Sequence, residues 1–136
     1  MRYVEESGYY VNRHSCFLLQ YHLVLVTKYR HPVLTGEVKD ALEDYTRRYF
    51  KDRGLVIQAL DIEPDHLHVL FDAGPQLELT SFVNAFKSGS SRRLRSDFPD
   101  EVSKFYWKPV FWSLSYFICS VSDRFAAAVK RYIENQ

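Results

Sequence analysis

The sequence predicts one α+β domain in which an antiparallel sheet is covered by helices. Runs rich in β-branched and aromatic residues predict strands, and they fall at 16–29, 55–62, 66–73 and 111–121. Apolar residues at helical spacing predict helices between them and at the end, at 35–54, 79–94 and 122–136. The order β-α-β-β-α-β is that of the ferredoxin-like, split β-α-β fold, which RRM-like sheets share, with one extra C-terminal helix.

Composition narrows the class of protein. With 136 residues, 46% of them apolar and 16% aromatic, the chain is long and apolar enough for one ordered core. Its apolar runs are far shorter than the roughly 20 residues of a membrane span, and its first residues lack the apolar core of a signal peptide. We therefore expect a cytoplasmic protein without a membrane partner. A net charge of +1 leaves nucleic-acid binding to be judged from the distribution of charge.

The first half of the chain gives clear boundaries. Residues 1–15 are polar and rich in tyrosine, and we interpret them as an arm that packs on a neighbour. The domain proper is expected over 16–136. Pro32 ends the first strand, Thr35 is a candidate cap for the first helix, and Gly54 ends that helix.

The second half contains two features that need an explanation. Gly89 lies inside the second predicted helix, where glycine costs roughly 1 kcal/mol relative to alanine. Either another group approaches the backbone closely there, or the helix is locally weak. Residues 100–109 are expected to form a loop, and Ser122 is a candidate cap for the last helix.

Two histidines stand one residue apart in the third strand. Side chains alternate along a strand, so His66 and His68 share one face while Leu67, Val69 and Phe71 share the other. Two imidazoles so placed can reach one metal ion, with at least one further donor from elsewhere. The alternative is that both are partly exposed polar residues. In the predicted topology this strand is central, which favours a functional role because a polar ring there needs a partner.

Tyr132 and Gln136 stand four residues apart in the last helix and so project from one side. Such a pair offers a phenolic nucleophile and an amide oxygen to a single metal. The alternative is that Tyr132 continues the apolar stripe of Phe125 and Val129, with its hydroxyl reaching water.

Several blocks of sequence resemble a known family. Asp65-His66-Leu67-His68-Val69 resembles the histidine-hydrophobic-histidine signature of the HUH endonuclease superfamily. Four other blocks resemble the single-tyrosine transposases of bacterial insertion sequences, the TnpA type of the 200/605 group: Tyr21-His22 with Thr27–Arg30, Lys87–Leu94, Phe111–Phe117 and Lys130–Gln136. Leu114 departs from the family pattern, which has proline there.

The resemblance implies a homodimer that cuts and rejoins single-stranded DNA at the ends of its element, next to imperfect hairpins. It implies His66, His68 and Gln136 as metal ligands and Tyr132 as the nucleophile that forms a 5′-phosphotyrosine intermediate. Two imidazoles suit Mn²⁺ or Zn²⁺ better than Mg²⁺, whereas the resemblance implies Mg²⁺ or Mn²⁺. It also implies composite sites, in which the tyrosine helix of one subunit serves the histidines of the other.

Basic and aromatic residues outside this set are candidates for DNA binding, by phosphate contacts or by stacking on unpaired bases. They are Lys28, Arg30, Lys87, Arg92, Arg95 and Trp107. For each of them the alternative is an ordinary solvated or core position.

Three other functions remain open at this point. An RRM-like RNA-binding module has a similar sheet, although the aromatic motif of that module is missing from the third strand. A metal-dependent phosphodiesterase would use water as nucleophile, so Tyr132→Phe would leave turnover intact. A domesticated HUH nuclease would cut DNA without moving its own gene.

Overall fold

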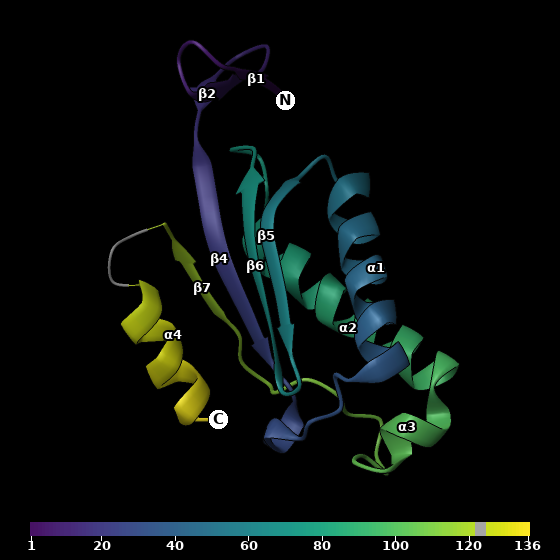
Figure 1. The fold of residues 1–136 in the computed structure, drawn as a ribbon. Helices are drawn as coiled ribbons and strands as arrows, with labels where there is room; N and C mark the ends of the chain where they lie inside the picture. Colours follow the sequence, from purple (N-terminus) through teal and green to yellow (C-terminus); the bar gives the residue numbers. More distant parts are fainter. Residues whose placement is uncertain (122–124) are drawn as a thin grey trace.

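A computed structural model describes residues 1–121 and 125–136 (Figure 1). Its strands form two antiparallel sheets: β1 (Arg2–Val4), β2 (Tyr9–Val11) and β3 (Cys16–Phe17) in a small one, and β4 (Leu19–Val26), β5 (Val56–Glu63), β6 (His66–Ala73) and β7 (Phe117–Ser120) in the main one. Its α-helices are α1 (Gly36–Asp52), α2 (Leu79–Asp97), α3 (Pro99–Ser103) and α4 (Phe125–Glu134). None of the described helices is long and apolar enough to cross a membrane.

The main sheet has the order β5-β6-β4-β7, with every neighbouring pair antiparallel. The histidine strand, β6, therefore lies inside the sheet between β5 and β4. Helices α1 and α2 cover one side of this sheet, and α4 lies beside the edge strand β7 (Figure 1). The predicted α+β fold with a central histidine strand and an extra C-terminal helix is confirmed.

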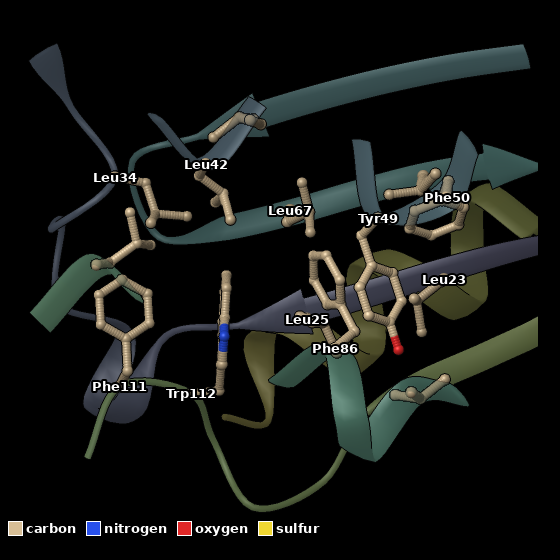
Figure 2. Close-up of a cluster of buried hydrophobic side chains, with 14 of the residues drawn as sticks. Leu23, Leu25, Leu34, Leu42, Tyr49, Phe50, Leu67, Phe86, Phe111 and Trp112 are labelled. Carbon is tan, nitrogen blue, oxygen red and sulfur yellow. The ribbon is translucent and has the colours of Figure 1, made fainter. Parts of the chain in front are cut away.

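The core explains why the histidines face away from the helices. Leu23, Leu67 and Phe71 are fully buried on the sheet face that meets α1 and α2, where they pack against Phe50 and Phe86 (Figure 2). Each such side chain contributes about 1.5–3 kcal/mol on burial. A shift of β6 by one residue would bring histidines into this core, so the packing fixes its register.

Two predicted strands are shorter in the structure. The strand predicted over 16–29 breaks into β3 and β4, and it ends in a 3₁₀ turn at Lys28–Arg30, where Tyr29 and Arg30 have φ of 59° and 55°. The strand predicted over 111–121 is regular only in β7, and Trp112 makes an isolated bridge to Thr27. These two predictions were wrong because pairing partners, rather than residue preference, decide where a strand ends.

Two further boundaries differ or remain untested. The predicted loop over 100–109 begins inside α3, whose first turn contains Pro99, a residue suited to that position. The candidate cap Ser122 lies outside the described residues.

The predicted N-terminal arm, 1–15, folds onto its own chain. Strands β1 and β2 pair with β3, so the small sheet crosses the predicted boundary at residue 16. Tyr10 is buried, and its hydroxyl donates to the Asp72 carboxylate of β6. Gln20 and Gln58 donate to the same carboxylate over 2.9 and 2.7 Å. This polar contact joins the arm to the main sheet, and packing of the arm on a neighbour stays a prediction.

Candidate active site

His66 is oriented by a carboxylate beside it. Its Nδ1 lies 2.8 Å from Asp65 Oδ1, and Asp65 Oδ2 accepts from Arg30 Nε over 3.2 Å. Burial raises the pKa of Asp65, but the hydrogen bonds from His66 and Arg30 outweigh it and hold the pKa below its ordinary value. The ionised carboxylate favours the tautomer with hydrogen on Nδ1, which leaves the lone pair on Nε2 of His66 for a ligand.

His68 contacts a third histidine. Its Nε2 lies 2.9 Å from Nδ1 of His22, and the two rings stack with centroids 5.2 Å apart. Its Nδ1 lies 3.8 Å from Asp61 Oδ2. Burial lowers the pKa of both His22 and His68, which favours the neutral form that binds metals.

His22 was not predicted to be a neighbour of the site. In the register of the sheet, Val24 pairs with His68 and His22 pairs with Leu70, so His22 lies diagonally across from His68 on the same face. The sequence indicates only that His22 and Val24, two residues apart in β4, point to the same face of the sheet. That signal becomes informative only when the register is known.

Tyr132 lies on α4 and Gln136 lies just past the end of that helix, with Ser115 as their common neighbour. Tyr132 Oη lies 2.8 Å from Ser115 Oγ, and Gln136 Oε1 lies 3.5 Å from the same hydroxyl. The Tyr132 ring also contacts Phe117 of β7, with centroids 5.6 Å apart. Burial raises the pKa of Tyr132, and the hydrogen bond with Ser115 opposes that rise.

The histidines and the tyrosine lie on the same side of the sheet but come from different elements, β6 and α4. Val24 of β4 pairs with His68 on one side and with Phe117 on the other. Two strand spacings, roughly 10 Å, therefore separate the backbone at His68 from the strand that Tyr132 contacts. Within one chain, the predicted ligand pair and the predicted nucleophile occupy adjacent parts of this face.

A cavity of about 310 Å³ lies beside the tyrosine helix. Lys28, Tyr29, Ser115 and Gln136 are among its lining residues. A cation in such a cavity is suited to an anionic substrate such as a phosphodiester. Tyr132 is not among the lining residues, but its hydrogen-bond partner Ser115 is, so Lys28, a predicted DNA contact, shares the cavity with a side chain that contacts the predicted nucleophile.

The other predicted DNA contacts are scattered over the molecule. Arg30 is engaged by Asp65, and Arg95 Nε donates to Ser91 Oγ over 3.1 Å. Trp107 is 85% exposed, with the Lys108 ammonium 4.7 Å from its ring centroid. Arg92 lines a different cavity, between α1 and α2.

Lys87, another predicted DNA contact, binds the backbone of its own chain. Its Nζ donates to the carbonyls of Ser113 and Leu114 over 2.7 and 2.9 Å. Burial lowers the pKa of Lys87, with a smaller contribution from the charge of Lys28. The side chain thus holds the irregular segment that leads to Ser115, which indicates why this segment does not continue as a strand.

The donor set fits a divalent metal only in part. Within residues 1–121 and 125–136, no group of three or more His, Cys, Asp or Glu side chains is arranged to hold an ion. His66 and His68 can supply two imidazole nitrogens, so a third protein ligand must be of another type. The amide oxygen of Gln136 is such a donor.

Comparison with known proteins identifies the family. The family model described as "Transposase IS200 like" matches residues 15–136. The chain belongs to the IS200-like transposase family. ISDra2 transposase TnpA of Deinococcus radiodurans is 40% identical over 120 residues, which cover 88% of this chain and 85% of the relative. The transposase of insertion sequence element IS200 of Salmonella typhimurium is 28% identical over 123 residues, covering 90% and 80%.

Solved structures agree with this assignment to the IS200-like family. A crystal structure of a candidate transposase from Deinococcus radiodurans superposes with a TM-score of 0.86 at 40% identity, covering 93% of this chain and 97% of that one. A REP-associated tyrosine transposase bound to a REP hairpin has a TM-score of 0.56 at 11% identity, covering 91% and 69%. The second likeness shows the fold alone.

Proposed function

We propose that this transposase cuts and rejoins single-stranded DNA through Tyr132, with a divalent metal held by His66 and His68. The main observation behind the proposal concerns the Tyr132 hydroxyl, which is hydrogen-bonded to Ser115. It lies on the same face of the sheet as the two histidines. Family membership supplies the class of reaction, which is DNA strand transfer.

The proposed reaction is a transesterification. Tyr132 Oη loses its proton and attacks the scissile phosphorus, the bond from phosphorus to the 3′-oxygen breaks, and that oxygen takes up a proton. The products are a 5′-phosphotyrosine and a free 3′-hydroxyl. The ester preserves the bond energy, so attack by a different 3′-hydroxyl joins a new strand without ATP.

We propose Mg²⁺ or Mn²⁺ as the metal, with the Gln136 amide oxygen as third ligand. The neutral state favoured for His68 and the carboxylate behind His66 suit the two imidazoles to this role. When bound, such an ion stabilises negative charge that develops on the scissile phosphate. Lys28, in the cavity next to Gln136, would hold a neighbouring phosphate.

We further propose a homodimer with composite sites. Tyr132 and Gln136 contact Ser115, next to the edge strand β7, while the histidine pair lies on the inner strand β6. A second subunit that supplies its tyrosine helix would complete the metal site, as the resemblance implies. We also propose that the protein recognises hairpins near the element ends, since the REP-associated tyrosine transposase was solved with one.

The first experiment tests tyrosine chemistry. Wild type, Tyr132→Phe and Tyr29→Phe are incubated with Mn²⁺ and labelled single-stranded DNA that carries the end of the element. We expect a denaturant-resistant adduct from wild type and from Tyr29→Phe, whose tyrosine lines the cavity beside Ser115. We expect no adduct from Tyr132→Phe, and none from wild type when chelator is added or when the DNA is duplex. Cleavage by Tyr132→Phe without an adduct would show a water nucleophile and refute the proposal.

The second experiment tests the composite site. Tyr132→Phe and His66→Ala are each expected to be inactive alone, and the two are mixed under conditions that allow subunits to exchange. In a composite dimer, the histidines of the first variant meet the tyrosine of the second, so the mixture regains cleavage. If subunit exchange is shown to have occurred and the mixture is still inactive, each active site must lie within one subunit.

A further inference from the structure

His22 is a buried polar ring on an inner strand of the main sheet. It belongs to β4, which pairs with β6 on one side and with β7 on the other, and the residue is 8% exposed. Burying a polar ring without a hydrogen-bond partner costs free energy. Nδ1 of His22 lies 2.9 Å from Nε2 of His68, and the two rings are inclined by 23°. The fold therefore holds His22 against one particular nitrogen of a predicted metal ligand.

That nitrogen lies on the side of His68 that faces the tyrosine helix. The strands have the order β5-β6-β4-β7, and α4 lies beside β7 (Figure 1). Nδ1 of His68 is on the side of β5, where Asp61 Oδ2 is 3.8 Å away, too far for a hydrogen bond. Nε2 is on the side of β4, where it meets His22. For a metal ion held between His68 and Gln136, Nε2 is therefore the nitrogen within reach.

Nε2 of His68 cannot bind His22 and a metal ion at the same time. A neutral imidazole has one N–H and one nitrogen lone pair. If His22 donates the hydrogen bond, that bond uses the lone pair on Nε2 of His68. If His68 donates, Nε2 carries the hydrogen and has no lone pair to offer. With either tautomer, a metal ion can bind Nε2 only after the contact with His22 is broken.

We propose that His22 is a positioning residue that competes with the divalent metal ion for Nε2 of His68. The inference rests on the proposed function, which assigns His68 as a metal ligand. The hydrogen bond fixes the orientation of the His68 ring, and metal binding replaces that bond. The exchange lowers the affinity for the ion, because the ion displaces a contact that is already made. His22 thus tunes the metal site without being one of its ligands.

The test compares Mn²⁺ binding by wild type, His22→Phe and His22→Asn in calorimetric titrations. Phenylalanine keeps a ring but has no nitrogen, so we expect Mn²⁺ to bind roughly fivefold tighter, the factor that corresponds to one lost hydrogen bond. Asparagine keeps an amide near the position of Nδ1, and we expect wild-type affinity. His14→Phe, at an exposed histidine of the N-terminal arm, is the matched control and should also bind as wild type does.

Two results of these titrations would overturn the proposal. Unchanged or weaker Mn²⁺ binding by His22→Phe would show that His22 does not compete with the ion. Equally tighter binding by His22→Phe and His22→Asn would mean that relief of packing, rather than loss of the hydrogen bond, raises the affinity.

Nitrogen NMR tests the same contact in the wild-type protein, so the outcome does not depend on how well a variant folds. A hydrogen bond between two ring nitrogens gives a scalar coupling, here between Nδ1 of His22 and Nε2 of His68. We expect this coupling before metal is added and its loss with saturating Mg²⁺. A coupling that persists with the ion bound, or that is absent from the start, would refute competition by His22.

His68→Ala separates this inference from the proposed function. The variant lacks the proposed ligand, so its affinity for Mn²⁺ should fall by at least about tenfold. If His68→Ala binds Mn²⁺ as tightly as wild type, His68 is not a ligand and both proposals fail. If His68→Ala loses affinity while His22→Phe gains none, the proposed metal site stands and only the role of His22 is wrong.

Discussion

Asp65 contacts His66 with one carboxylate oxygen and Arg30 with the other, over 2.8 and 3.2 Å. Arg30 reaches this position from a turn in which it and Tyr29 adopt left-handed backbone angles. A residue predicted to bind DNA thus positions the carboxylate that orients a predicted metal ligand. These hydrogen bonds link Arg30, in the turn after β4, through Asp65 to His66, the first residue of β6.

Replacing Asp65 with asparagine should weaken metal binding. An amide is a poorer acceptor for the His66 Nδ1 hydrogen, and loss of such a supporting group typically costs 10–100-fold in affinity. Calorimetric titration with Mn²⁺ measures this directly. Asp61→Asn is the matched control, because that side chain is 71% exposed and lies 3.8 Å from His68. Equal affinity in wild type and Asp65→Asn would show that Asp65 does not support a metal ligand.

Ser115 should hold Tyr132 in position for attack. Ser115→Ala removes a hydrogen bond worth about 1 kcal/mol and should slow adduct formation roughly five- to tenfold under single turnover with saturating DNA. Ser115→Thr keeps the hydroxyl and should restore most of the rate. Ser120→Ala, at an exposed site in β7, serves as control. A Thr variant as slow as the Ala variant would speak against the hydroxyl.

Tyr10→Phe should destabilise the protein by about 1.5–3 kcal/mol, because it removes a hydrogen bond to the buried carboxylate of Asp72. Urea unfolding of wild type and variant gives the difference in free energy of unfolding. Tyr9→Phe, at a tyrosine that is 47% exposed, should have no effect beyond about 0.5 kcal/mol. Equal losses in the two variants would mean that the bond to Asp72 contributes nothing.

The same hydroxyl should make stability depend on pH. Burial, together with the hydrogen bond and charge of Asp72, raises the pKa of Tyr10 above its ordinary value of 10.0. The unfolded chain therefore loses this proton first, so the stability that Tyr10 adds is complete below pH 10 and falls as the pH rises further. The gap in unfolding free energy between wild type and Tyr10→Phe should narrow above pH 10. A constant gap from pH 8 to pH 11 would contradict this sign.

Gly89→Ala should destabilise the protein although alanine is the better helix former. The gain of about 1 kcal/mol in helix propensity is outweighed by the collision with the Tyr45 hydroxyl, since overpacking costs about 1–3 kcal/mol. Tyr45→Phe removes that oxygen and leaves the nearest ring carbon 3.4 Å from the new Cβ. The alanine should therefore be tolerated in the double variant. A double-mutant cycle by urea unfolding checks this, and purely additive effects would disprove the contact.

Some predictions from sequence depended only on short-range periodicity, and these agree with the structure. The alternation around Leu67 and Val69 indicated which face of β6 is buried, because successive side chains of any strand point to opposite sides. The spacing of Tyr132 and Gln136 likewise predicted that they lie close together, although α4 ends at Glu134, before Gln136. The catalytic and metal-binding roles of these residues stay predictions.

Other features depended on contacts between distant segments. β-propensity predicted that residues 111–121 form one strand. In the structure, Lys87 of α2 donates hydrogen bonds to the carbonyls of Ser113 and Leu114, and the regular strand begins only at Phe117. The contact of His22 with His68 joins residues 46 positions apart and depends on the register of β4 against β6. The pattern of residues within one segment does not show which distant segment that segment will contact.

The sequence by itself determined the order of the main-sheet strands and of α1, α2 and α4, the side of β6 that carries His66 and His68, and the proximity of Tyr132 to Gln136, because periods of 2 and 3.6 belong to single segments. The tertiary structure alone decided that His22 joins the histidines, that Asp65 and Arg30 stand behind His66, and that Gly89 makes room for Tyr45. Those contacts form where packing of the whole core fixes register and helix position. Their geometry is therefore a property of the folded chain rather than of any one stretch of it.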